Sequence, residues 1–374
     1  MAMTTASTVL TPSRLALARK RRRLTLTRLA EVSGISRITL SGYENSRATP
    51  GPEGLATLAD ALGVRPEFLV GSDLEEIPEG AVSFRAKSKL TVAQKDAARG
   101  AGRYALLLNE WIEDHFQLPT PDVPTLTNHD PEQAAEIVRA RWGLGRAAIP
   151  NVVHLLEAHG VRVFTLAEDC ADVDAYSLYW YGTPIVVLNT GKSGERGRFD
   201  AAHELGHLVL HGEQATPHGP SSENEANRFA AAFLMPEADV LSRGLQHATA
   251  QRILRDKQRW TVSAMALTHR LHELQLLTDW EYRSVCVHLS RRGYRRGEPD
   301  SAATGETSQL LQKVFKAVRE QGSLKDIADH ISLDWEELNR HVFGLVPLGL
   351  AGGRTERSTP LEDDRPKLEL VTSN

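Results

Sequence analysis

Apolar residues recur every three to four positions along most of the chain, a spacing that predicts amphipathic helices. Near the N-terminus the pattern comes in short runs separated by turns, which predicts a bundle of small helices. Longer helical patterns follow through the rest of the chain. The main helices predicted in this way cover residues 14–23, 28–32, 37–44, 55–62, 91–117, 198–211 and 223–236, with further helices between 131 and 160, between 240 and 290 and between 307 and 346.

Three short runs rich in β-branched and aromatic residues predict strands instead. They cover 161–164, 175–181 and 184–189. The last two flank Gly182 and Thr183, which predicts a hairpin around that turn. Because the strands are so few, the predicted fold class is mostly α with a small β-sheet (α+β).

Two of the short N-terminal helices are joined by a tight turn. Gly34 can adopt a positive φ in this turn, and Ser36 is placed to cap the helix that follows. A helix, a short turn and a second helix form the geometry that sets a recognition helix in the major groove of DNA. The alternative is an ordinary helical bundle whose basic residues are solvated.

The recognition helix would present polar side chains at its N-terminal end. Such side chains can contact phosphates or base edges. We expect Ile38 and Leu40 to point mostly inward. The candidate DNA-contacting residues are Ser36, Arg37, Thr39 and Ser41.

The helix predicted over 198–211 contains the pattern H-E-x-x-H. Because residues i and i+4 share one face of a helix, His203 and His207 can aim two imidazoles at one zinc ion. Glu204 lies beside them as the candidate general base for the attacking water. Gly206 weakens the helix and would be tolerated if another backbone passed close by. His211 lies one turn further on, so we expect it to support the site or the fold rather than share the ion.

A catalytic zinc takes three protein ligands and keeps one position open. Metzincins place a third histidine six residues after the second, but that position is Glu213 here. The better candidate is Glu223 on the next helix, where Asn227 follows at i+4 and could orient a ligand histidine through its second ring nitrogen. Glu225 is the competing ligand, and a solvated helix face is the alternative for both glutamates.

These two helices resemble those of the ImmA/IrrE metallopeptidases. That family carries the pattern R-F-x-x-A-H-E-L-G-H-L, followed by E-x-x-A-N-x-F-A-x-x-L-L-M-P. The chain matches the first pattern over 198–208 and most of the second over 223–236. The resemblance implies a central zincin-like peptidase domain with Zn²⁺ on His203, His207 and Glu223, and with Glu204 as the general base.

The N-terminal bundle resembles the Cro/C1-type (XRE) helix-turn-helix family. The matching residues lie at 30–31, 34–36, 40–41 and 43–45, although Ser46 stands where a glycine is usual. The resemblance implies binding to a double-stranded DNA operator, and such domains usually read paired half-sites as homodimers. Relatives of the peptidase cleave a Cro/C1-type repressor, so a repressor, or the chain itself, is the implied substrate.

The composition limits the class of protein but does not indicate a function. With 41% hydrophobic and 25% charged residues in 374, the chain is ordinary for a globular protein of two or three domains. A net charge of −4 gives no overall nucleic-acid signature. Cys170 and Cys286 suit a reducing cytoplasm and lack the spacing of a metal site. Since no apolar run approaches the ~20 residues that span a bilayer, no membrane association is expected.

The resulting organisation has six parts, of which the two at the ends are expected to be flexible or disordered. They are a flexible N-terminus (1–12), a helix-turn-helix domain (13–72), a helical connector (73–130), a metallopeptidase domain (131–290), a C-terminal helical region (291–351) and a disordered tail (352–374).

The predicted function is a DNA-binding transcriptional regulator that carries a zinc-dependent endopeptidase domain, acting in stress or mobile-element control. The alternative is a non-proteolytic repressor or antitoxin-like regulator whose peptidase fold is a sensor or scaffold. A purely structural zinc site is the weakest reading, because such a site has no use for the base that Glu204 would supply.

Overall fold

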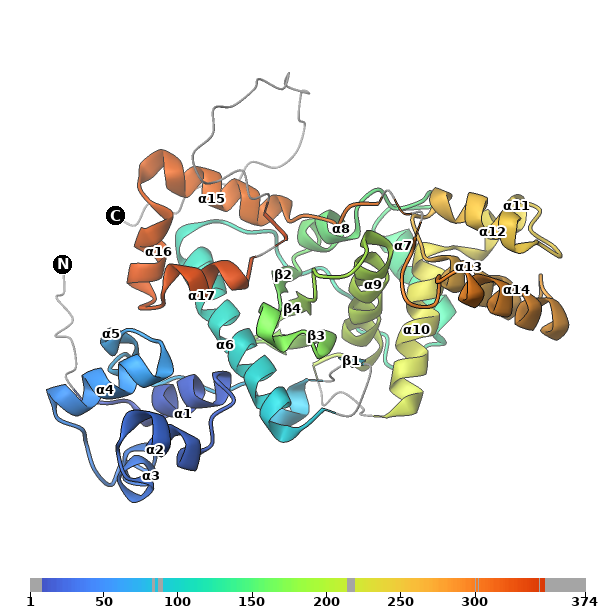
Figure 1. Cartoon of the computed structure of the whole chain (residues 1–374). Coiled ribbons are helices and arrows are strands. Elements are labelled where there is room, and N and C mark those ends of the chain that lie inside the picture. The colour runs from blue at the N-terminus through green and yellow to red at the C-terminus, as the bar shows by residue number, and fades with distance from the viewer. Residues whose placement is uncertain are drawn as a thin grey trace.

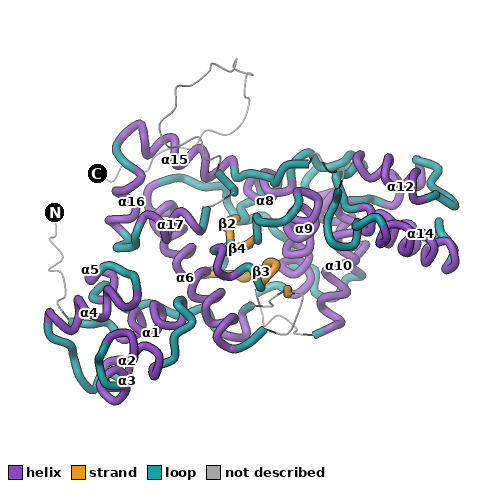
Figure 2. The backbone as a smooth tube through the Cα atoms, viewed as in Figure 1, coloured by secondary structure: helices purple, strands orange, loops and turns teal. Residues whose placement is uncertain are grey.

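The computed structural model describes residues 9–82, 85–86, 90–213, 219–299, 301, 303–342 and 344–346. Helices surround one small sheet, which confirms the predicted fold class (Figure 1, Figure 2). The predicted tail over 352–374 and the first eight residues lie outside the described part of the chain. Within the described part, no helix is long and apolar enough to cross a membrane.

The N-terminal bundle packs five short helices around a core of fully buried leucines and Phe68. It begins earlier than expected, because Leu10 is buried and the Thr11 N–H donates to the carbonyl of Leu69. The helices are α1 (Pro12–Arg21), α2 (Leu26–Ser33), α3 (Arg37–Glu44), α4 (Pro52–Leu62) and α5 (Pro66–Leu69).

The turn between α2 and α3 has the predicted chemistry. Gly34 ends α2 with φ 69°, and the Ser36 hydroxyl accepts a hydrogen bond from the Thr39 N–H at 3.1 Å. Ser46 also has a positive φ, 57°, and stands where the resembling family usually has glycine. Glu44 accepts two hydrogen bonds from Arg19 of α1, which fixes α3 on the bundle.

The connector contributes a short 3₁₀ helix (Glu79–Ala81), strand β1 (Arg85–Ala86) and the long helix α6 (Val92–His115). A capping box between Thr91 and Gln94 starts α6. Tyr104 of α6 is fully buried and packs edge-on against both Phe68 of the N-terminal bundle and His341 near the C-terminus. Helix α6 therefore packs against both the N-terminal bundle and the C-terminal helices.

The sheet has the strand order β1-β3-β4-β2, formed by β2 (Arg162–Thr165), β3 (Val173–Trp180) and β4 (Thr183–Leu188) with β1. Strands β3 and β4 form the predicted antiparallel hairpin, whereas β2 runs parallel to β4. The sequence did not predict β1, which pairs with the first half of β3 opposite Val173 and Ala175.

The central helices are α7 (Pro131–Arg141), α8 (Val152–Ala158), α9 (Gly194–His211), α10 (Pro220–Leu234), α11 (Glu237–Ser242), α12 (Ala250–Asp256), α13 (Ala264–Glu273) and α14 (Asp279–Arg291), with 3₁₀ turns at Glu168–Cys170 and Lys257–Arg259. Helix α9 lies against β3 and β4, and α10 packs along α9. A Cβ on Gly206 would lie 3.2 Å from the Ala226 Cα, so glycine permits this close approach of the two helices.

The C-terminal helices α15 (Gln309–Gln321), α16 (Leu324–His330) and α17 (Trp335–Arg340) lie above α6 and beside the N-terminal bundle (Figure 1). Helix α15 packs on α8, and α17 packs on α6. This region therefore contacts both the central helices and the connector.

An ion cluster centred on the buried side chains of Arg21 and Glu337 joins three distant parts of the chain. Arg21, at the end of α1, has no exposed side-chain surface and contacts Asp169 at 2.6 Å and Glu337 at 2.8 Å. Arg22 reaches Glu337 as well, and Arg23 pairs with Asp172. The basic end of α1 therefore binds carboxylates of this chain rather than facing solvent.

The charges of this cluster favour the ionised carboxylate of Glu337. Burial would raise the pKa of Glu337, but Arg21, His341 and Arg22 outweigh burial and hold the pKa below its usual value. Removing the Glu337 charge would leave Arg21 buried beside a neutral partner.

We predict that Glu337→Gln lowers the free energy of unfolding at neutral pH by about 3 kcal/mol, because it breaks a buried ion pair on one side only. Chemical denaturation followed by circular dichroism measures the change. Glu336→Gln removes the same charge from an exposed neighbour on α17 and should have little effect. Equal stability of the two variants would contradict the assigned role of the cluster.

Candidate metal centre

Helices α9 and α10 bring the three predicted metal ligands together. The Nε2 atoms of His203 and His207 lie 3.0 Å apart. Each lies 3.4 Å from a carboxylate oxygen of Glu223. Both imidazoles are buried, whereas the Glu223 side chain is one-third exposed, which leaves one side of the cluster open to solvent.

These separations fit a four-coordinate zinc ion. Zinc holds nitrogen and oxygen ligands at about 2.0–2.2 Å, so neighbouring atoms of a tetrahedral ligand set lie about 3.3 Å apart. The two imidazole Nε2 atoms are 3.0 Å apart, and each lies 3.4 Å from a different oxygen of Glu223. One donor atom from each of the three residues gives a set that lies within 4.8 Å, which is compact enough to close around one ion. Two nitrogens and one carboxylate also form the donor set of catalytic zinc sites that keep a fourth position open.

The charge state of Glu223 suits a ligand. Burial would raise the pKa of its carboxyl, but hydrogen bonds with His203 and His207 lower that pKa well below the usual range. The carboxylate is therefore ionised at neutral pH, as a metal ligand must be.

The second ring nitrogen of each candidate ligand histidine has a partner. His203 Nδ1 lies 3.1 Å from Asn227 Oδ1, as the sequence predicted for Asn227. His207 Nδ1 lies 3.0 Å from His211 Nδ1, and His211 Nε2 lies 3.2 Å from Glu225 Oε2. Glu225 therefore faces away from the candidate ion and holds His211.

The donor and acceptor roles along the series of hydrogen bonds from His207 through His211 to Glu225 are mutually consistent. If His207 presents Nε2 to the ion, its Nδ1–H donates to His211, whose Nε2–H then donates to Glu225. Burial lowers the pKa of His211, which favours the neutral ring that can accept at one nitrogen and donate at the other. We expect this series of hydrogen bonds to orient the His207 ring.

Glu204 is buried beside the ligand pair and contacts the sheet. Its Oε2 accepts a hydrogen bond of 2.8 Å from the hydroxyl of Ser177, on β3. Ser177 was not predicted, because nothing in a strand pattern shows which helix residue a small hydroxyl will contact. The catalytic role of Glu204 and the metal-binding role of the three candidate ligands remain predictions.

The N-terminal half of α9 is fixed by the segment that leads into α15. Arg198, the arginine that opens the α9 motif, is buried and forms an ion pair with Glu306. Nearby, Lys192 pairs with Asp174 of β3 at 2.7 Å and with Asp200 of α9. These contacts hold α9 against the sheet and against the segment before α15.

The candidate DNA-contacting residues divide into two groups. Arg37 is exposed at the start of α3, whereas the hydroxyls of Ser36 and Thr39 hydrogen-bond each other at 2.8 Å within the cap. Ser41 is half-buried and lies near the Asn45 amide. Helix α3 lies on the side of the bundle that faces away from the sheet (Figure 1).

The expectation for Ile38 was wrong. Its side chain is 86% exposed, whereas Leu40 is fully buried. Residues two apart in a helix are separated by about 200° around the axis, so the two side chains cannot both point inward. Ile38 therefore projects beside Arg37 from the exposed face of α3.

Two protein-family models match the chain. The family described as the IrrE N-terminal-like domain, Peptidase M78, matches residues 156–272, and a helix-turn-helix family matches residues 15–69. The chain joins a helix-turn-helix domain to an IrrE-like domain. The metal cluster lies within the first match, and α3 lies within the second. A search of curated proteins found no match.

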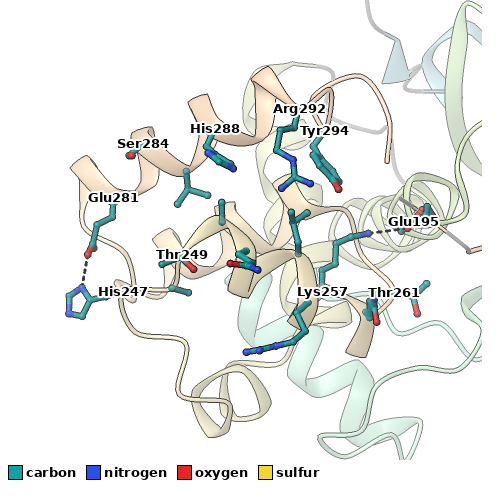
Figure 3. Close-up of a pocket in the computed structure, with 18 of the residues that line it drawn as sticks. Glu195, His247, Thr249, Lys257, Thr261, Glu281, Ser284, His288, Arg292 and Tyr294 are labelled. Carbon is teal, nitrogen blue, oxygen red and sulfur yellow. Dashed lines mark hydrogen bonds and ion pairs between the residues drawn. The ribbon is translucent and has the colours of Figure 1, made fainter. Parts of the chain in front are cut away.

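A large cavity lies away from the cluster of His203, His207 and Glu223. It has a volume of about 1300 Å³ and is bounded by α12, α14 and the segment after α14 (Figure 3). Lys257 at one end reaches Glu195 of α9. A smaller cavity of about 430 Å³ is lined by Asn227, the partner of His203, together with Phe199 and Met265.

We predict that the full-length protein binds about one zinc ion and that Glu225→Ala weakens this binding about tenfold or more, because it removes the carboxylate that holds His211. Competition with a fluorescent zinc chelator measures the affinity. Glu237→Ala, which removes an exposed carboxylate from α11, is the matched control and should leave the affinity unchanged. Wild-type affinity in Glu225→Ala would show that His207 needs no such support.

Proposed function

We propose that this DNA-binding regulator uses its IrrE-like domain as a zinc-dependent endopeptidase that cleaves a regulatory protein. The helix-turn-helix match supports the DNA-binding half, and the Peptidase M78 match supports a peptidase fold. The observation that carries the enzymatic half is the buried Glu204 carboxylate beside a three-donor cluster. A structural zinc site would use a fourth protein ligand and no base.

The residues of the site divide the work between them. His203, His207 and Glu223 would hold the ion, and bound zinc supplies a Lewis acid that polarises the scissile carbonyl and makes the attacking water more acidic. Glu204 takes a proton from that water and passes it to the leaving amine. Ser177 orients the Glu204 carboxylate through its hydrogen bond to Oε2.

The substrate is a protein chain that enters in an extended conformation beside β3. An edge strand next to a peptidase site can pair with substrate backbone. β1 pairs with β3 opposite Val173 and Ala175, and we propose that the substrate backbone lies along the second half of β3. We propose a Cro/C1-type repressor, or this chain itself, as the protein that is cut.

On the DNA side, α3 enters the major groove of an operator. Arg37 supplies a cation for a phosphate or a guanine edge, and exposed Ile38 supplies an apolar contact for a thymine methyl group. Ser36, Thr39 and Ser41 position the start of the helix and contact the backbone. A homodimer would place two such helices on paired half-sites.

We predict that Glu204→Gln retains zinc but loses proteolysis by a factor of about 10² or more, because the site loses its general base. Purified candidate repressors are incubated with the zinc-loaded protein, and mass spectrometry follows the fragments of substrate and regulator. Glu213→Gln, an exposed change two residues after α9, is the control. Cleavage at the wild-type rate in Glu204→Gln would remove the catalytic assignment while leaving DNA binding intact.

We also predict that Arg37→Ala weakens binding to DNA from the protein's own promoter and lowers the salt dependence of the affinity by about one ion. Fluorescence anisotropy at several salt concentrations gives both quantities. Arg283→Ala removes an arginine that is 77% exposed on α14 and should change neither. If the two variants bind alike, α3 does not contact the DNA in this way.

A further inference from the structure

A third cavity lies where the C-terminal helices meet the IrrE-like domain. Its volume is about 620 Å³, and it is bounded by α8, the start of α15 and the loops around residues 117–119 and 144–151. Cavities of roughly 300–1,000 Å³ are the usual size for small-molecule sites. The cavity is separate from the metal cluster, because none of its lining residues belongs to α9 or α10.

The lining of this cavity is mainly apolar. Ile149 and Leu310 are buried at its inner side, and Leu118, Leu144 and Leu155 are partly buried around it. Such a surface favours a ligand with an apolar body, because transfer of that body from water is stabilising.

Lys313 gives the cavity a charge preference. It is half-buried on α15, one turn after Leu310, and makes no ion pair or hydrogen bond with any described residue. A partly desolvated cation on an apolar surface is stabilised by an anionic partner. The cavity therefore suits a molecule that carries one acidic group on an apolar body.

The other titratable residues of the lining do not reverse this preference. Glu157 is buried, and its carboxylate accepts hydrogen bonds from the Ser308 hydroxyl and from the N–H groups of Gln309 and Leu310. That carboxylate is therefore occupied by the N-terminus of α15. His154, the remaining titratable residue of the lining, can donate to an acid.

The cavity lies beside two sets of hydrogen bonds that join α8 and the start of α15. Glu157 of α8 accepts from the first N–H groups of α15, and Glu306, just before α15, accepts from Val152 and Val153 at the start of α8. Glu306 also pairs with Arg198 of α9. A ligand in the cavity would therefore contact both α8 and α15. The hydrogen bonds between these helices, together with the Arg198–Glu306 ion pair, connect the C-terminal helices to α9.

We propose that this cavity binds a free amphiphilic acid and that Lys313 binds its acidic group. The apolar lining holds the body of the molecule against α8 and α15. Because both walls contribute, the bound acid stabilises the contact between the C-terminal helices and the IrrE-like domain. This site is independent of zinc binding and of the proposed proteolysis.

The test uses the full-length protein and the fluorescent probe anilinonaphthalene sulfonate, an anion with an apolar body. Octanoate and octylammonium then compete for the probe at a mildly alkaline pH, where they carry opposite charges on the same chain. Lys313→Met removes the cation from the cavity, and Lys316→Met removes an exposed lysine from the same helix as the matched control. Leu155→Trp fills the cavity without changing its charge.

Octanoate should displace the probe at about tenfold lower concentration than octylammonium, in the wild type and in Lys316→Met. Lys313→Met should abolish this difference, and folded Leu155→Trp should bind less probe. Equal displacement by the two ions in the wild type, or equal behaviour of the two lysine variants, would overturn the proposal. Lys316 is exposed and Lys313 is only half-buried, so we expect both lysine variants to fold. The comparison of the two lysine variants therefore tests the proposal even if Leu155→Trp does not fold.

Discussion

The candidate site depends on the close packing of α10 against α9. Gly206 lies inside the H-E-x-x-H segment, and the missing side chain lets the backbone at Ala226 approach α9. This approach brings Glu223 within 3.4 Å of both imidazoles. The loss of helix propensity at Gly206, about 1 kcal/mol relative to alanine, is therefore the cost of a ligand supplied by a second helix. A larger residue at 206 would push α10, and Glu223 with it, away from the ion.

The sequence predicted those parts of the structure that rest on local periodicity. Helix α3, helix α9 and the β3–β4 hairpin follow from helical spacing, capping residues and a turn, and the structure confirms them. The i, i+4 rule also predicted that Glu223 and Asn227 would face the histidines, and the structure places both there. Two family matches confirm the resemblances that these motifs carry.

The features that were not predicted depend on contacts between distant parts of the chain. Ser177 and Glu204 are 27 residues apart, and Arg21 and Glu337 are 316 apart, so no local pattern links them. Ile38 is the exception, since the helical period alone excludes that it and Leu40 both point inward. The His211–Glu225 contact could also have been suggested, because His211 follows His207 at i+4.

The ion cluster links the helix-turn-helix bundle to the IrrE-like domain and to the C-terminal helices. Arg21 leaves the helix-turn-helix bundle, Asp169 belongs to the IrrE-like domain, and Glu337 belongs to the C-terminal helices. Loss of the Glu337 charge would be felt most at Arg21, since both side chains are buried and a buried charge that loses a partner is strongly destabilising. A regulator that combines DNA binding with a peptidase fold needs such a connection if one activity is to affect the other.

Zinc-edge X-ray absorption of the full-length protein loaded with one equivalent of zinc tests whether two imidazoles and the Glu223 carboxylate hold one ion. We expect two imidazole nitrogens with light oxygen ligands in the wild type, and a changed oxygen shell with weaker zinc binding in Glu223→Ala. Sulfur in the shell, or a ligand set that Glu223→Ala leaves unchanged, would contradict this expectation.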